Sequence, residues 1–105
     1  MALTLKELDQ DGRVIVKVQG EIDLYSSPQL REALLNAIPN AGELLAVDLC
    51  EVAYMDSSGV ATLVEGLQAM GKAKKPFVLL APSQAVLKVL QLSRLDSVFD
   101  IREVL

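Results

Sequence analysis

Apolar and polar residues alternate at the start of the chain. Residues 3–6 alternate between the two kinds, and the valines at positions 14, 16 and 18 alternate with mostly polar residues after the segment Asp9-Gln10-Asp11-Gly12. A period of two places apolar side chains on one face of a strand, and a glycine among acidic residues favours a tight turn. The two segments therefore predict a β-hairpin.

Three later segments carry apolar residues at helical spacing. The first begins at Ser26-Ser27-Pro28, with Ser27 as the expected N-cap and Pro28 at the first helical position. The second runs from residue 57 to about 72, and the third begins at Pro82-Ser83. The residues expected to face the core are Leu30, Ala33, Leu34, Ala37, Ile38, Val60, Leu63, Val64, Leu67, Met70, Val86, Val89 and Leu90.

Two largely apolar runs, residues 44–49 and 77–81, have the length of strands covered on both faces, and residues 98–101 are a candidate last strand. Strands that alternate with helices pair in parallel through right-handed crossovers, whereas the hairpin is antiparallel. We therefore expect an α/β fold with a mixed β-sheet, in which an N-terminal hairpin is followed by alternating helices and strands. Residues 44–49 are expected to form the central strand.

Length and composition restrict the organisation of the chain. The 105 residues, 51% of them hydrophobic, provide one core, and no repeat or linker indicates a second module, so residues 1–105 are expected to form a single domain. The apolar runs are far shorter than the roughly 20 residues that span a bilayer, which argues against membrane insertion. Residues 1–11 lack the features of a signal peptide, so a cytoplasmic location is expected.

The residue inventory argues against several chemistries. The chain has no histidine and one cysteine, so the usual zinc sets, an internal disulfide and a Ser-His-Asp triad are excluded. Its net charge of -4 comes from scattered residues without a basic stripe, which disfavours nucleic-acid binding. Cys50 follows an apolar run and is expected to be an inert core residue rather than a redox sensor. We expect no enzymatic activity.

Two groups of carboxylates could indicate an enzyme instead. A receiver-like domain could use Asp9, Asp11, Asp48 and Asp56, but the first two lie in a turn between strands and not between a strand and a helix. The glycines do not match any phosphate-binding spacing. Glu21 and Asp23 could act as an acid/base pair, but they alternate with Ile22 at a strand end. Contact with solvent or with a partner's basic residue is therefore favoured for both.

Residues 49–59 carry the most information about function. The chain is expected to leave the central strand, form a short loop and enter the second helix at Asp56, whose carboxylate would cap the amide of Ser58 or Gly59. The hydroxyls of Ser57 and Ser58 would then face outwards at the positive end of the helix dipole, where a phosphate is tolerated. A partner packed against this loop would have to bury or repel the added charge. The alternative is a helix start without any regulatory role.

Two sequence landmarks bring the chain close to a known family. They are Gly20-Glu21-Ile22-Asp23, and Val47-Asp48-Leu49 followed by Tyr54-Met55-Asp56-Ser57-Ser58-Gly59-Val60, with a weaker match over residues 87–95. With these landmarks the chain resembles the STAS domain, specifically the stand-alone anti-sigma factor antagonists of bacteria, over nearly its whole length. The resemblance implies the STAS fold, which agrees with the mixed sheet expected above.

The resemblance also implies a switch. It assigns Ser57 as the phosphorylation site, because this serine directly follows the motif aspartate, and Ser58 as a neighbour that shapes recognition. The implied partner is an anti-sigma factor that is also a serine kinase; it binds the unmodified antagonist, and a metal-dependent serine phosphatase resets the cycle. ATP and magnesium belong to the kinase, so this chain is expected to need no cofactor. The expected partner-binding residues are Glu21, Asp23, Tyr25, Asp56, Ser58 and Gly59.

Departures from the family pattern are small. Val60 stands where leucine is common, and Tyr25 is aromatic where many relatives are more polar, which could indicate a different partner. The alternative function is a STAS subunit that docks on the ATPase of a lipid-transport ABC system or acts in another signalling assembly. The apolar residues that could support weak homodimerisation, or simply close the core, are Leu92, Leu95, Val98 and Phe99.

Overall fold

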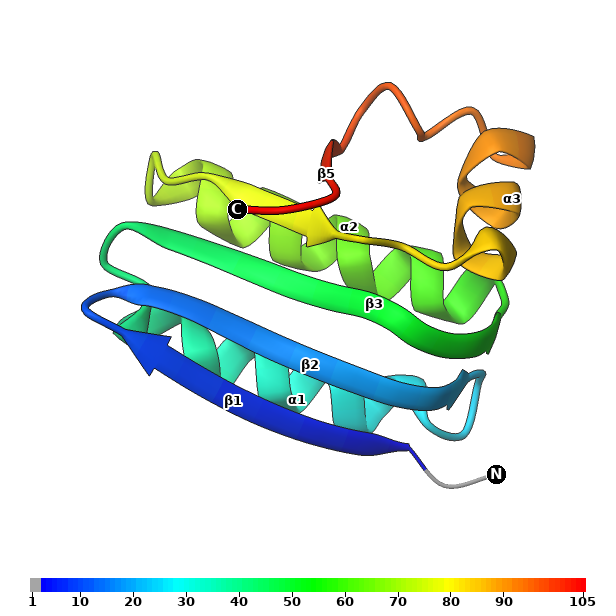
Figure 1. Ribbon diagram of the computed structural model, residues 1–105, viewed down its shortest axis with the longest axis horizontal. Helices are drawn as coiled ribbons and strands as arrows, with labels where there is room; N and C mark the ends of the chain where they lie inside the picture. Colours follow the sequence, from blue (N-terminus) through cyan, green and yellow to red (C-terminus); the bar gives the residue numbers. More distant parts are fainter. Residues whose placement is uncertain (1–2) are drawn as a thin grey trace.

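Five strands form one sheet in the order β1-β2-β3-β4-β5 in the computed structural model, which describes residues 3–105 (Figure 1). Met1 and Ala2, with which the expected domain begins, lie outside the described residues. The strands are β1 Thr4–Gln10, β2 Arg13–Ile22, β3 Leu44–Met55, β4 Phe77–Leu80 and β5 Asp100–Arg102. β1 is antiparallel to β2, and all other neighbours are parallel. The predicted mixed sheet, with β3 at its centre, is confirmed.

The predicted hairpin is formed by β1 and β2. Asp11 and Gly12 connect the strands with φ angles of 58° and 87°. Two positive φ angles in succession are the geometry of a type I′ turn, whose twist matches that of the strands and which favours Asp-Gly. The amide of Gly12 also donates to the Asp9 carboxylate at 3.2 Å. Local chemistry therefore fixes the register of the hairpin.

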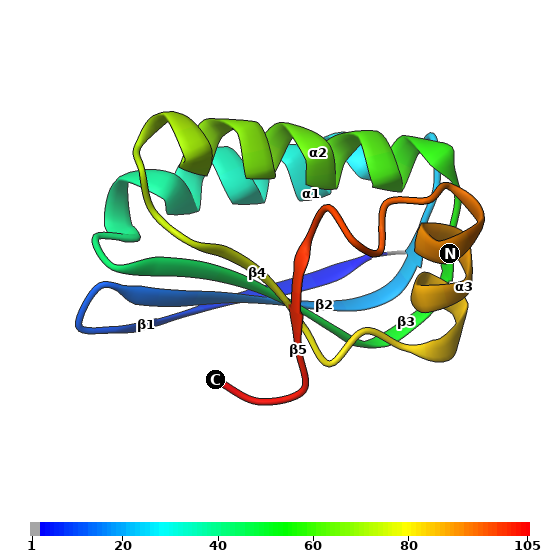
Figure 2. The same cartoon turned by 90° about the horizontal axis from the view of Figure 1, so that it is seen from above.

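The helices are α1 Ser27–Ala37, α2 Ser57–Lys72 and α3 Gln84–Leu92, with a short 3₁₀ helix, η1 Ile38–Asn40, after α1. Figure 2 shows α1 and α2 lying side by side over one face of the sheet. Arg31 of α1 and Glu65 of α2 form an ion pair of 2.7 Å. α3 lies against β3, and the Ser83 hydroxyl at its start donates to the Val52 carbonyl at 2.7 Å. The main core between the helices and the sheet includes Val14, Val16, Val18, Leu30, Leu34, Leu45, Val47, Leu49, Leu63, Met70 and Leu90.

The start of α1 differs from the prediction by one residue. Ser26, not Ser27, is the N-cap residue, and its side chain makes no capping hydrogen bond. The reason is that the Ser26 hydroxyl accepts the amide of Asp23 at 2.9 Å and donates to the Glu21 carbonyl at 2.8 Å. Pro28 is therefore the second helical residue rather than the first.

β3 is longer than predicted, and this changes the surroundings of Cys50. The strand continues through residues 50–55, where a loop was expected, because β2 continues beside it and pairs Glu21 with Tyr54 and Ile22 with Met55. Side chains alternate along a strand, so Cys50 follows Asp48 on the face opposite α1 and α2. Cys50 is exposed. The prediction of a core cysteine is wrong.

The C-terminal segment is shifted relative to the prediction. β5 begins at Asp100 rather than at residue 98. Phe99 is buried and its ring lies 6.5 Å from that of Phe77, whereas Leu92 and Val98 are exposed. Over the part of the chain that the structure describes, no helix is long and apolar enough to span a membrane.

Candidate functional site

The carboxyl ends of β2 and β3 meet at one edge of the sheet. Because the two strands are parallel, the loop before α1 and the start of α2 leave the sheet at the same end (Figure 1). The amide of Asp56 donates to the Ile22 carbonyl at 3.1 Å, which ties the two segments together. We call this region the carboxyl edge and define it as residues 21–27 and 54–58. It brings together all the predicted site residues except Gly59.

Asp56 organises the first turn of α2. Its carboxylate accepts the amide of Ser58 at 2.9 Å, as predicted for an N-cap. The same carboxylate oxygen accepts the Ser58 hydroxyl, and the Asp56 carbonyl accepts the amides of Gly59 and Val60 at 3.1 and 3.2 Å. The prediction that the Ser58 hydroxyl faces outwards is therefore wrong, because Asp56 holds it against the helix start.

Ser57 is the first residue of α2 and is exposed. Among residues 3–105, its hydroxyl has no hydrogen-bond partner, in contrast to the hydroxyl of Ser58. The amides of residues 58–60 already donate to Asp56, so they are not free to bind an added anion. A phosphate on Ser57 would therefore extend into solvent beside the Asp56 carboxylate. The arrangement offers a hydroxyl that an external enzyme can reach.

Gly59 lies on the buried side of the same turn. A Cβ atom on this residue would be 2.5 Å from Met55 Cγ and 2.8 Å from Ile22 Cγ2. The absence of a side chain thus lets α2 approach the ends of β2 and β3. Gly59 was expected to contact the partner, but it faces the core and offers the carboxyl edge no exposed side chain.

Asp23 and Ser26 fix the loop between β2 and α1. One carboxylate oxygen of Asp23 accepts the amides of Tyr25 and Ser26, each at 2.9 Å, and the Ser27 amide donates to the Asp23 carbonyl at 2.8 Å. The backbone amide of Ser26 is the main reason that the pKa of Asp23 lies below its ordinary value. Ser26 is buried and was not among the predicted site residues. The Asp-x-x-Ser spacing, typical of side-chain-stabilised turns, is the sequence signal that would have identified it.

Three apolar side chains are exposed at the carboxyl edge. Tyr25 is 91% exposed, Leu24 is 68% exposed and Tyr54 is 48% exposed. Glu21 lies directly across from Tyr54 in the pairing of β2 with β3. The edge therefore combines carboxylates with aromatic and aliphatic surface, a composition suited to contact with another protein.

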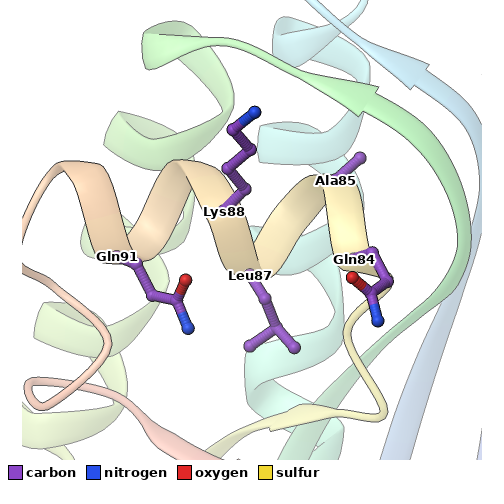
Figure 3. A pocket seen from close by; sticks show the side chains of 5 residues that line it. All are labelled: Gln84, Ala85, Leu87, Lys88 and Gln91. Atoms are coloured by element: carbon purple, nitrogen blue, oxygen red, sulfur yellow. The ribbon is translucent and has the colours of Figure 1, made fainter.

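Other surface features are weaker candidates for a binding site than the carboxyl edge. A shallow hollow on α3 is lined by Gln84, Ala85, Leu87, Lys88 and Gln91, which all extend from the same helix (Figure 3). Lys88 is its only charged residue, so the hollow lacks the converging polar groups of a ligand site. Within residues 3–105, no three His, Cys, Asp or Glu side chains are close enough to hold a metal ion. The Asp48 carboxylate raises the pKa of the Cys50 thiol.

Comparisons with known proteins agree with the fold and extend over nearly all of the chain. Residues 7–103 match the family model described as "Mlab, STAS domain". The anti-sigma-B factor antagonist of Listeria monocytogenes is 31% identical over 104 residues, which cover 99% of this chain and 90% of that protein. An anti-sigma factor antagonist from Mycobacterium paratuberculosis has a similar structure, with a TM-score of 0.88, 29% identity and coverage of 99% of this chain and 88% of that one.

A third relative has been solved in two chemical states. The anti-sigma factor antagonist SpoIIAA in its unphosphorylated form is 27% identical, with a TM-score of 0.77 and coverage of 95% of this chain and 87% of that chain. The Bacillus cell fate determinant SpoIIAA in the phosphorylated form is 25% identical, with a TM-score of 0.71 and coverage of 95% and 90%. The fold is therefore one that anti-sigma factor antagonists adopt.

Proposed function

The chain belongs to the STAS domain family, with anti-sigma factor antagonists among its relatives, and from this premise we propose that it is a phosphorylation-switched antagonist. In its unmodified form it binds an anti-sigma factor that is also a serine kinase, and this binding releases the sigma factor. Phosphorylation of Ser57 ends the complex, and a metal-dependent serine phosphatase restores it. The protein is a binding protein of the cytoplasm, one domain over residues 1–105, and not an enzyme.

The exposed, unpartnered hydroxyl of Ser57 is the observation that carries this proposal. Ser57 begins α2 at the carboxyl edge and is the exposed serine there among the described residues, because Ser26 and Ser27 are buried and the Ser58 hydroxyl is bound to Asp56. SpoIIAA, a relative of the same fold, exists in a phosphorylated and an unphosphorylated form. The exposed hydroxyl supports Ser57 as the acceptor, and the two forms of SpoIIAA support phosphorylation of this fold.

Electrostatics explains how one phosphate could switch binding. A phosphoserine carries about -1.5 to -2 charges at pH 7, and here the amides of Ser58, Gly59 and Val60 already donate to Asp56. The new charge would stay exposed beside Asp56, so a partner seated on the edge would have to desolvate it. To change a complex from 99% bound to 1% bound, affinity must fall by about 10⁴-fold. Burial of an unpaired dianion can supply such a change.

The contacts of this partner would come from the exposed parts of the edge. Glu21, Tyr25, Asp56 and Ser58 present side chains or polar atoms there, whereas the Asp23 carboxylate accepts amides of its own loop and Gly59 is buried. ATP and magnesium would be bound by the kinase, so no cofactor is assigned to this chain. The phosphorylated chain would present the same edge to the phosphatase.

The direct test is to incubate the purified chain with each anti-sigma factor kinase of its own cell and ATP, and to locate phosphate by peptide mass spectrometry. We expect modification of Ser57 in the wild type and none in Ser57→Ala, with Ser58→Ala as the matched control that is still modified. Calorimetry should show that the phosphorylated chain binds the kinase far more weakly. Equal affinity of the two forms would contradict the switch.

The alternative is a STAS subunit that docks on the ATPase of a lipid-transport ABC system or acts in another signalling assembly. The curated relatives favour the first function, because they are named as anti-sigma-B factor antagonists. The alternative is tested by measuring the binding of the same purified chain to the transport ATPases of its cell. Stable binding to such an ATPase, with no binding to any anti-sigma factor, would reverse the preference.

A further inference from the structure

Tyr25 is more exposed than any other large apolar side chain among residues 3–105. Its exposed fraction is 91%, and that of the adjacent Leu24 is 68%. Aromatic side chains lose little conformational entropy when a partner covers them and contribute strongly to the centres of interfaces. An exposed aromatic and an exposed aliphatic side chain therefore stand next to each other in one loop, on the edge that carries Ser57.

The backbone under these side chains is held by internal hydrogen bonds. The Asp23 carboxylate accepts the amides of Tyr25 and Ser26, and the Ser26 hydroxyl donates to the Glu21 carbonyl at the end of β2. Ser26 is buried, so this network joins the loop to the sheet. A loop fixed before binding avoids the cost of ordering at the moment of contact. The network therefore fixes the direction in which Tyr25 leaves the surface.

We propose that Tyr25 is a preorganised aromatic anchor for the protein partner, and that Asp23 and Ser26 are the positioning residues that hold it. The anchor rests on the proposed function, since its partner is the anti-sigma factor. In this proposal Asp23 does not pair directly with a basic residue of the partner, because its carboxylate accepts hydrogen bonds from the amides of its own loop. Asp23 acts on the interface through the position of Tyr25.

The charges around Tyr25 define the surface that would receive it. Residues 21–27 and 54–58 contain three carboxylates, those of Glu21, Asp23 and Asp56, and no lysine or arginine. A receiving site should therefore be an apolar pocket for the tyrosine ring and Leu24, rimmed by basic side chains. A membrane rich in anionic lipids would be repelled by the same carboxylates. The occupant is a protein.

Binding measurements with the purified anti-sigma factor kinase test the anchor. Tyr25→Ala should weaken binding at least tenfold, whereas Tyr25→Phe should stay within about threefold, since the ring is the contact. Val104→Ala, which truncates an apolar side chain 80% exposed after β5, is the matched control and should bind like the wild type. Tyr25 is exposed, so the alanine variant should fold normally.

The positioning role is tested by two substitutions at Asp23. Asp23→Asn keeps a side-chain oxygen for the two amides and should retain most of the affinity, whereas Asp23→Ala should lose nearly as much as Tyr25→Ala. The double variant Asp23→Ala/Tyr25→Ala should bind no more weakly than Tyr25→Ala alone, because residues that act as a unit are not additive. In the free chain, ¹⁵N relaxation should show an ordered Tyr25 amide in the wild type and Asp23→Asn, and a mobile one in Asp23→Ala and Ser26→Ala.

Each outcome decides a separate point. Equal affinity of the wild type and Tyr25→Ala for the kinase overturns the anchor and leaves the proposed function intact. An Asp23→Ala variant with an ordered Tyr25 amide, or with a loss of affinity that simply adds to that of Tyr25→Ala, overturns the positioning role. A wild-type chain that binds none of its cell's anti-sigma factors overturns the proposed function, and the anchor with it.

Discussion

The carboxylate of Asp56 accepts hydrogen bonds from both donors of Ser58, its amide at 2.9 Å and its hydroxyl. Ser57, one position earlier, turns in another direction because successive helical residues point about 100° apart. Two adjacent serines thus have different surroundings: one is bound to the cap and the other is exposed. This difference is the structural basis for assigning the switch to Ser57 rather than to Ser58.

Substitutions at Ser57 should separate regulation from folding. We expect Ser57→Ala to stay bound to the kinase in the presence of ATP, and Ser57→Asp to bind at least tenfold more weakly because of its added charge. Both should melt within a few degrees of the wild type, since the side chain is exposed. Calorimetry and thermal unfolding provide the two measurements. A strongly destabilised Ser57→Asp variant would indicate a structural serine instead.

Removal of the α2 cap should cost stability. Asp56→Ala leaves the Ser58 amide without its acceptor and should lower the free energy of unfolding by about 1 kcal/mol. Asp56→Asn, which can still accept the amide, should lose only a few tenths of a kcal/mol. Urea unfolding with a common m-value checks both. Equal losses in the two variants would show that the charge, and not the hydrogen bond, stabilises the helix start.

Two glycines of α2 should respond in opposite ways to the same substitution. Gly59→Ala forces a Cβ atom against Met55 and Ile22 and should lower the free energy of unfolding by about 1–3 kcal/mol. Gly71→Ala meets nothing within 4 Å and should raise it by up to about 1 kcal/mol through helix propensity. Chemical denaturation of the pair is the measurement. A neutral Gly59→Ala would show that α2 can move away from the sheet without cost.

The lowered pKa of Asp23 predicts a pH dependence. Because the folded loop favours the charged carboxylate, the stabilisation is present above the unfolded pKa of about 3.9 and is lost as the pH falls through the lower folded value. The wild type should therefore lose stability more steeply below about pH 4 than Asp23→Asn. Unfolding curves at several pH values and an NMR titration of the carboxyl carbon test this. Parallel curves for the two proteins would contradict it.

Cys50 should be accessible but slow to react. It is exposed, yet the neighbouring Asp48 carboxylate raises its pKa and so reduces the thiolate fraction at neutral pH. Iodoacetamide should modify the native chain more slowly than an unstructured cysteine peptide at the same pH. Asp48→Asn should increase the rate severalfold. The same rate in both proteins would mean that Asp48 does not control the thiol.

The sequence alone determined the features that depend on neighbours along the chain. The Asp-Gly turn, the bounds of α2 and the capping role of Asp56 were predicted correctly, because turns, periodicity and caps arise from interactions within a few residues. The order of strands and helices followed from the same patterns together with the rules for parallel connections. The landmarks around Glu21 and Asp56 were enough to indicate the family.

Only the tertiary structure decided which of these residues face one another. β3 continues to Met55 because β2 lies beside it, and this pairing exposes Cys50 and brings the Asp23 loop next to Asp56. The need for a glycine at position 59 depends on the side chains of Met55 and Ile22, which end two different strands. Contacts between segments far apart in sequence leave no local pattern, so the surroundings of each site residue became visible only in the folded chain.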